Sequence, residues 1–583
     1  MARPAAPIPG CPDSPSVHAR AAGRSPWRGP GGHPACRALC WTSSGTLPAP
    51  GIRFPARARE GGRKGAIRQG RQLHPHPRTR GRPPRLPIIG ADGILVSRLL
   101  LAAPHSKRKH LAMSVRPVQP GEEARPTATQ TTDVVLRLVG ESGEGTVSLG
   151  DLAVQMFAAM GLDIYTFQTF PAEIKGGTVM YQIRAKSGTP LSQGDAVDIL
   201  VALNGEGFGL FGQGLREDGI LLYDSDVFRP DPEPGRTEYA LPISALARAE
   251  KEAVRHEIEG EQLKRLPAPK NMVGLGALLR LVNAPLEPAE RYVSDLFGRK
   301  GEAIVRMNVS ALRTGAHHVE EQIAGRRTPR VFPVERIEPA IRVNGNQMLA
   351  MGAIAAGLRF YAGYPITPAT EIMEFLAKEL PQHGGDVIQA EDEIAALGMC
   401  LGASYAGKKA MTASSGPGIS LMCEQINLAA QAEIPVVIAD IQRGGASTGM
   451  PTKTSQGDLN LALYGVHNES PRIVLAPSSV TDCFWTAVDA FSLAEEFQCP
   501  VLVLSEQALA TRICTVPPPD LSHVQSSDRL TPSAEELKGG YLRYRDTETG
   551  VSAMAVPGTP GGVYTATGIE HDEEGNPGYT PQL

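Results

Sequence analysis

Residues 409–441, KAMTASSGPGISLMCEQINLAAQAEIPVVIADI, decide the fold class of this chain. The short apolar runs at its two ends, 409–414 and 435–441, predict strands that are buried on both faces. Between them, residues 419–431 have the apolar spacing of a helix. A strand, a helix and a second apolar strand in this order predict an α/β fold with a parallel sheet covered by helices.

The same alternation continues on both sides of this stretch. It predicts further strands at 359–364, 386–390, 472–476 and 500–505, and helices at 347–358, 368–380, 394–405 and between the last two strands. Such a repeated pattern indicates one sheet with helices on both faces.

An earlier segment predicts a second α/β unit. A strand at 133–139, a loop with Gly140, Gly143 and Gly145, a helix to about 160 and a strand at 163–170 form a βαβ opening. A later strand is expected at 196–203, followed by helices at 245–264 and 275–282. The glycine spacing is not that of a dinucleotide fingerprint, and no acid closes the second strand, so NAD binding is disfavoured. A tight turn and a phosphate-binding loop both remain open for these glycines.

The formal net charge of -3 averages two unlike parts. Residues 1–112 hold 17 Arg and 3 Lys against three acids, which leaves a net charge of −20 for the rest of the chain. An acidic body is a poor nucleic-acid binder, and no apolar stretch is long enough to predict a membrane-spanning helix. The 8 Cys form no C-x-x-C pair, which argues against zinc or iron–sulfur ligation by this chain. Scattered cysteines predict reduced thiols and a cytoplasmic protein.

Three interpretations of residues 1–112 stay open. This Pro- and Arg-rich segment could be a basic disordered arm, a targeting peptide, or translated upstream sequence with Met113 as the true start. The strong excess of Arg over Lys favours the third. Residues 311–342 lack sustained periodicity, so we expect a linker there, and the adjacent His317 and His318 are expected to be exposed rather than to bind a metal.

Residues that are unusual in an apolar sheet follow four of the expected strands of the 343–530 region. They are Tyr364, Pro365 and Thr367; Glu391, Asp392 and Glu393; Ser415 and Gly416; and Arg443. Ligands bind at the carboxyl ends of parallel strands, so these residues predict one site. Each group except Arg443 also has a structural interpretation. Thr367-Pro368 fits a helix cap, the acids fit a first helical turn, and Ser415-Gly416 fits a turn. A guanidinium at the position of Arg443 is suited to gripping a carboxylate.

Several longer motifs resemble one enzyme family. Residues 361–370 (YAGYPITPAT), 389–396 (QAEDEIAA), 413–418 (ASSGPG), 442–452 (QRGGASTGMPT) and 456–459 (QGDL) are similar to the α subunit of 2-oxoacid:ferredoxin oxidoreductases, most closely the 2-oxoglutarate type. Residues 169–177 (TFPAEIKGG) and the glycine loop resemble the γ subunit of the same enzymes. The resemblance implies a fused γ–α chain, in which a γ-type Rossmann-like domain precedes a domain that binds the pyrimidine half of thiamin diphosphate.

The resemblance also implies roles for individual residues. Glu393 matches the glutamate that bonds to thiamin N1′, and Thr367, Arg443 and Thr452 match residues that hold the substrate carboxylate. Tyr364, Pro365, Ser415 and Gly416 are expected to line the cofactor site. For the loop with Gly140, Gly143 and Gly145 we keep contact with coenzyme A or another phosphate as a hypothesis.

The family's Gly-Asp-Gly diphosphate signature is missing from this sequence. The resemblance therefore implies a partner β subunit that carries Mg²⁺ and an iron–sulfur cluster, with coenzyme A as co-substrate and ferredoxin as electron acceptor. We expect an extension at 1–112, a γ-like domain at 113–310, a linker at 311–342, a pyrimidine-binding domain at 343–530 and a C-terminal segment at 531–583. The expected reaction is the oxidative decarboxylation of 2-oxoglutarate to succinyl-CoA. Pyruvate, a branched-chain 2-oxoacid or a truncated, non-catalytic scaffold remain alternatives.

Overall fold

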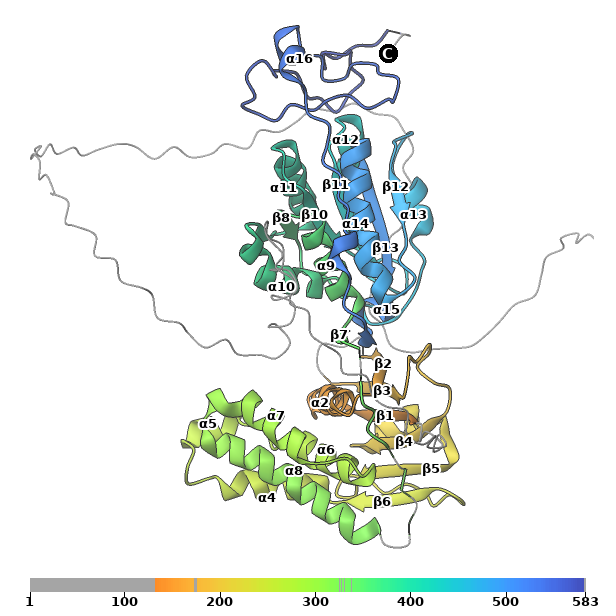
Figure 1. Cartoon of the computed structure of the whole chain (residues 1–583). Helices are drawn as coiled ribbons and strands as arrows, with labels where there is room; N and C mark the ends of the chain where they lie inside the picture. Colours follow the sequence, from red (N-terminus) through yellow and green to blue (C-terminus); the bar gives the residue numbers. More distant parts are fainter. Residues whose placement is uncertain are drawn as a thin grey trace, which may run out of the picture. The chain divides into compact units, whose positions relative to one another are not determined.

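The computed structural model describes residues 132–580, except 172–175, 324, 325, 327, 330 and 337. The interpretations of residues 1–112, including Met113 as a start, therefore lie outside the described residues. Two sheets organise the described part of the chain (Figure 1).

The first sheet is mixed, with the strand order β6-β5-β4-β1-β3-β2-β14-β7. Its strands are β1 (Asp133–Glu141), β2 (Asp163–Thr169), β3 (Thr178–Lys186), β4 (Val197–Ala202), β5 (Leu215–Asp224), β6 (Thr237–Leu241), β7 (Ile341–Val343) and β14 (Cys514–Val516). Strand β3 lies antiparallel between β1 and β2. The predicted order of strand, helix and strand is correct, but an antiparallel strand separates the two predicted neighbours. Strand β3 was not predicted. It begins directly after Gly176 and Gly177, and its sequence alternates apolar and polar residues only in part.

Helices gather beside the first sheet. They are α2 (Thr146–Ala159), α3 (Gly205–Phe211), α4 (Ile243–Ala253), α5 (Gly260–Arg265), α6 (Lys270–Leu281), α7 (Glu287–Phe297) and α8 (Glu302–Ile323), with a 3₁₀ turn at Gly298–Lys300. The long helix α8 corrects the expected linker start at residue 311. A side chain at Gly276 of α6 would overlap the Leu312 carbonyl of α8, and one at Gly315 of α8 would overlap the Val273 carbonyl of α6. Helix α8 is therefore held in place by close backbone contact with α6. Its outward face is polar, which is why its sequence resembles that of a linker.

The second sheet has the strand order β12-β13-β11-β10-β8-β9, and all neighbouring strands in it are parallel. Its strands are β8 (Phe360–Gly363), β9 (Asp386–Gln389), β10 (Ala410–Ser414), β11 (Val436–Gln442), β12 (Ile473–Leu475) and β13 (Pro500–Glu506). The predicted parallel sheet is confirmed, and each strand lies within two residues of its predicted bounds.

Helices cover both faces of the second sheet. They are α9 (Gly345–Ala355), α10 (Thr370–Glu379), α11 (Glu393–Tyr405), α12 (Gly416–Gln431), α13 (Leu459–Tyr464), α14 (Val480–Phe497) and α15 (Gln507–Thr511), with a 3₁₀ turn at Leu380–His383. A 3₁₀ turn at Leu521–His523 and the short helix α16 (Ala534–Lys538), which has no buried residue, follow β14. Helices α9, α10 and α14 share one apolar core with the sheet, while α11 and α12 share another. Successive residues of β11 alternate between these two cores, as a strand with two buried faces requires.

The stretch after β14 has little regular structure and is anchored by buried arginines. Arg543 is fully buried, and its guanidinium donates to the side chains of Glu433, Gln498 and Ser552. Within the described residues, no helix is long and apolar enough to cross a membrane.

Candidate functional site

The parallel sheet reverses its strand order between β8 and β10. From β8 the chain moves outward to the edge strand β9, and it then returns past β8 to β10. The loops after β8 and β10 therefore diverge and leave a crevice at their carboxyl ends, which is where open α/β sheets bind ligands. Tyr364 follows β8 directly, and Ser415 and Gly416 follow β10. The predicted location of the site thus coincides with the topological switch point.

Glu393 is a buried carboxylate at the start of helix α11. It is only 6% exposed, whereas Glu391 and Asp392 are exposed. Asp392 caps the helix, and its carboxylate accepts from the Ala395 amide at 2.7 Å. A side chain at Gly418 would lie 2.7 Å from Glu393 Oε1. Helix α12 can therefore approach this carboxylate only because residue 418 is glycine.

Arg443 extends from the end of β11 and is held by two backbone carbonyls. Its Nη1 donates to the Thr367 carbonyl at 2.7 Å, and its Nη2 donates to the Thr448 carbonyl at 2.6 Å. Its Nε has no partner among the described residues. Burial lowers the pKa of Arg443, and the negative charge of Glu393 opposes that shift. The two charged side chains predicted for the site are therefore within electrostatic reach of each other.

A cavity of about 450 Å³ lies beside Arg443. Gly416 and Pro417 at the start of α12, Thr448 and Asp458 also line it. The Asp458 carboxylate lies close to Gly416. A Cβ atom at that position would come within 2.6 Å of Asp458 Oδ2. Ser415 is the fully buried N-cap residue of α12, and its hydroxyl has no partner among the described residues.

The loop after β8 contributes its backbone to the site. Thr367 is exposed, and its carbonyl accepts from Arg443. The Thr367–Pro368 peptide is cis, and helix α10 begins at Thr370, with Ala369 as its N-cap residue. The alternative interpretation of Thr367-Pro368 as a helix cap is therefore wrong. Tyr364 is 42% exposed and Pro365 is half-buried.

Thr452 does not join the residues around the cavity. Its hydroxyl donates to the Phe170 carbonyl at the end of β2, at 2.8 Å. The Thr452 side chain is thus hydrogen-bonded to the first α/β unit. This contact joins segments far apart in the chain, so no local sequence pattern could have predicted it.

The glycine loop after β1 already holds a carboxylate. Gly143 and Gly145 have positive φ, and Gly145 is the N-cap residue of α2. The Glu144 carboxylate accepts from the Glu141 amide and from the Asn204 side chain, each at 2.8 Å, and it lies 3.5 Å from Lys270 Nζ. An incoming phosphate would compete with this internal anion. Among the described residues, no group of three or more His, Cys, Asp or Glu is arranged for a metal.

Asp440 is a buried acid that the sequence reasoning missed. It is fully buried in β11, neither of its carboxyl oxygens has a partner among the described residues, and it pairs in register with Ser414 of β10. Burial, and then the charge of Asp458, raise the pKa of Asp440 well above its usual range. Asp440 could have been noticed as a single acid within an otherwise apolar predicted strand. The strand pattern alone, however, does not indicate what such an acid does.

Asp440→Asn is expected to change how stability depends on pH. An acid whose pKa is raised in the folded state binds more protons there, so wild-type stability falls as pH rises above the unfolded value near ~4. The slope is at most about 1.4 kcal/mol per pH unit. Both proteins are unfolded with urea at several values between about pH 4 and pH 8. As the pH rises, the variant should gain stability relative to wild type. The exposed Asp386→Asn change should show no such gain, and parallel curves for wild type and Asp440→Asn would refute the assignment.

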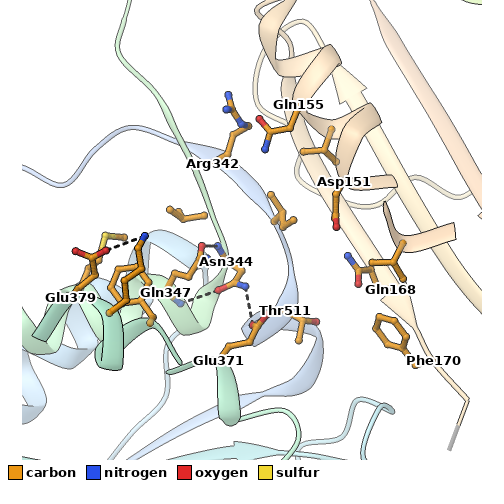
Figure 2. Close-up of a pocket in the computed structure, with 17 residues that line it drawn as sticks. Asp151, Gln155, Gln168, Phe170, Arg342, Asn344, Gln347, Glu371, Glu379 and Thr511 are labelled. Carbon is orange, nitrogen blue, oxygen red and sulfur yellow. Dashed lines mark hydrogen bonds and ion pairs between the residues drawn. The ribbon is translucent and has the colours of Figure 1, made fainter. Parts of the chain in front are cut away.

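A second cavity, of about 520 Å³, is lined by residues near both sheets (Figure 2). Glu371 accepts from the side chains of Asn344 and Asn346 at 2.9 and 3.2 Å, and Asp151 accepts from the Tyr181 hydroxyl at 3.0 Å. Burial raises the pKa of both carboxyls. This cavity was not predictable from the sequence, because its lining residues come from segments far apart in the chain.

Known proteins that resemble this chain point to one family. Residues 351–582 match the family model "Pyruvate flavodoxin/ferredoxin oxidoreductase, thiamine diP-bdg", and residues 135–318 match "Pyruvate ferredoxin/flavodoxin oxidoreductase". The 2-oxoglutarate oxidoreductase subunit KorA of Mycobacterium tuberculosis is 35% identical over 471 residues, which cover 77% of this chain and 71% of that protein. The chain belongs to the 2-oxoacid:ferredoxin oxidoreductase family.

Two further members of the 2-oxoacid:ferredoxin oxidoreductase family extend the comparison. The α subunit of 2-oxoacid:ferredoxin oxidoreductase 2 from Aeropyrum pernix is 32% identical, covering 76% of this chain and 75% of that protein. A solved 2-oxoglutarate:ferredoxin oxidoreductase from Magnetococcus marinus, with 2-oxoglutarate, coenzyme A and succinyl-CoA bound, has 42% identity and a TM-score of 0.70. That match covers 77% of this chain and 76% of the other. The predicted family and fold class are confirmed, including the thiamin-diphosphate-binding domain.

Proposed function

We propose that this chain is the fused γ–α subunit of an enzyme that oxidatively decarboxylates 2-oxoglutarate to succinyl-CoA and reduces ferredoxin. The curated relatives are named as 2-oxoglutarate or 2-oxoacid oxidoreductase subunits, and the solved relative contains 2-oxoglutarate and coenzyme A. The observation that carries the proposal is that a buried glutamate and a buried arginine lie within electrostatic reach of each other beyond the carboxyl ends of the parallel strands.

Glu393 fits a role beside the pyrimidine of thiamin diphosphate. It is a buried carboxylate, and no side chain at Gly418 occupies the space next to its Oε1. Bound thiamin diphosphate would supply the carbanion that attacks the 2-oxo carbon. Glu393 would accept the hydrogen bond from N1′ of the pyrimidine, while Tyr364, Pro365, Ser415 and Gly416 would surround the ring.

Arg443 is proposed to bind the substrate carboxylate. Backbone carbonyls fix two of its nitrogens, so the guanidinium is oriented before substrate arrives and its remaining N–H groups can pair with a carboxylate. Thr367 would assist from the loop after β8. Thr452 is not included in this role, because its hydroxyl already donates to the Phe170 carbonyl.

The proposal includes a partner β subunit that holds the diphosphate, Mg²⁺ and the iron–sulfur cluster. Exposed apolar side chains border the site: Ile394 follows Glu393, Leu421 lines the cavity, and Met450 belongs to the loop after Arg443. Exposed apolar groups beside a site are typical of a protein interface. Coenzyme A is proposed as the acyl acceptor. Its phosphates would contact the loop of Gly140, Gly143 and Gly145 in place of the Glu144 carboxylate. The cytoplasm is the proposed compartment.

The function is tested by producing the full chain with its β subunit and measuring CoA-dependent ferredoxin reduction. We expect kcat/KM for 2-oxoglutarate to exceed that for pyruvate and 2-oxoisovalerate by at least about tenfold. A preference for pyruvate or 2-oxoisovalerate would overturn the substrate assignment. An assembled complex that turns over none of the three would support a non-catalytic scaffold.

A further inference from the structure

The loop that follows Arg443 determines how this arginine is held. The Gly444 amide donates to the Lys453 carbonyl at 2.8 Å, and the Met450 amide donates to the Gly444 carbonyl at 2.7 Å. These bonds close residues 444–453 into a compact loop, whose Thr448 carbonyl accepts from Arg443. Any change in the loop therefore moves one of the two carbonyls that orient the guanidinium.

The closing end of this loop is bonded to the last residues of β2. Lys453 Nζ donates to the Thr169 hydroxyl and, at 3.2 Å, to the Phe170 carbonyl. Thr452 donates to the same carbonyl. Thr169 is buried and Lys453 is half-buried. A charged donor in a partly buried site makes a stronger hydrogen bond than a neutral donor in water.

Strand β2 is itself fixed at this place. It pairs with β14, the Thr166 hydroxyl accepts from the Ile513 amide at 2.9 Å, and the Arg512 guanidinium lies 4.6 Å from the centre of the Tyr165 ring. The β2 end is thus a firm anchor for the arginine loop rather than a mobile neighbour.

We propose that Lys453 is a positioning residue for the substrate site, which bonds the arginine loop to the end of β2 and thereby orients Arg443. The γ-like part of the chain then contributes to 2-oxoacid binding without touching the substrate. This inference rests on the proposed function for its kinetic consequence, but the loop contact itself can be tested without turnover.

Four variants separate this role from general packing. Lys453→Met removes the donors and keeps most of the aliphatic stem, Lys453→Arg keeps donors, and Thr169→Val removes the facing hydroxyl with little change in shape. The double variant Lys453→Met/Thr169→Val tests whether the two groups act together. Lys408→Met, a change at an exposed lysine just before β10, is the matched control.

The first measurement is amide hydrogen exchange in the full chain with its β subunit. Exchange at residues 444–450 should be about tenfold faster in Lys453→Met than in wild type, faster in Thr169→Val, and unchanged in Lys408→Met. Unchanged exchange in Lys453→Met would overturn the proposal, whether or not the complex turns over a 2-oxoacid.

The second measurement is kinetic. KM for the 2-oxoacid should rise about tenfold in Lys453→Met with a smaller change in kcat, and Lys453→Arg should recover most of the loss. The double variant should match Lys453→Met. Additive effects, or a fall in kcat at constant KM, would show that Lys453 does not act by orienting Arg443. If wild type is inactive while the exchange pattern holds, the proposed function fails and the loop contact stands.

Discussion

Glu393→Gln is expected to lower kcat by about 10²–10⁴-fold, the range typical for loss of a positioned proton-transfer group. Glutamine has nearly the same shape, so the contact with Gly418 and the Asp392 cap should persist. What is lost is the negative charge that would favour a proton at thiamin N1′. Turnover of the assembled enzyme with saturating thiamin diphosphate and 2-oxoglutarate provides the measurement.

The neighbouring Glu391→Gln change is the control for this prediction. Glu391 is exposed and precedes the helix cap, so its replacement should leave kcat within about twofold of wild type, as expected for a surface change away from the chemistry. Urea unfolding should show that both variants are folded. Full turnover in Glu393→Gln would mean that another group performs the proposed proton transfer.

Arg529→Met is expected to destabilise the second α/β unit by about 3–5 kcal/mol. Arg529 and Glu495 form a buried pair, with side chains 5% and 4% exposed. Arg529 Nε and Nη2 donate to the two Glu495 oxygens at 2.7 and 2.6 Å, and Nη1 donates to the Ser404 carbonyl at 2.6 Å. Methionine fills similar volume but leaves a buried carboxylate without its partner. Urea unfolding at neutral pH measures the loss.

Two further variants test whether this loss of stability comes from the unpaired buried carboxylate. Arg529→Met/Glu495→Leu removes both charges and should recover a large part of the stability, because the unpaired carboxylate is gone. Arg255→Met breaks an exposed pair with Glu252 and should cost less than about 1 kcal/mol. Equal losses in the buried and exposed pairs would contradict the role assigned to burial.

The parallel sheet was predictable because its central strands are buried on both faces. Strand β11, for example, is apolar except for Asp440 and Gln442, and a helix-forming segment precedes it. The site was predictable to the same extent, since a parallel sheet brings its strand ends to one edge. Glu393 and Arg443 followed from this rule together with a family resemblance.

Other features depend on contacts that no local pattern contains. Helix α8 looks polar in sequence, yet Gly315 allows it to pack closely on α6. Strand β3 separates β1 from β2, because sheet order is set by long-range pairing. Thr452 faces β2 rather than the cavity for the same reason. Its assignment required knowing which segments far apart in the sequence are neighbours.

The strands β7 and β14 have a consequence for how the thiamin-binding region is attached. The chain enters that region through β7 and pairs with the first sheet again through β14, which lies next to β7 at the sheet edge. It then returns to the region, where Arg529 and Arg543 bond to Glu495 and Glu433. The region is therefore attached to the first sheet at two points in the sequence. Lengthening the connection before β7 should consequently change its orientation little, since the second anchor at β14 would still hold it.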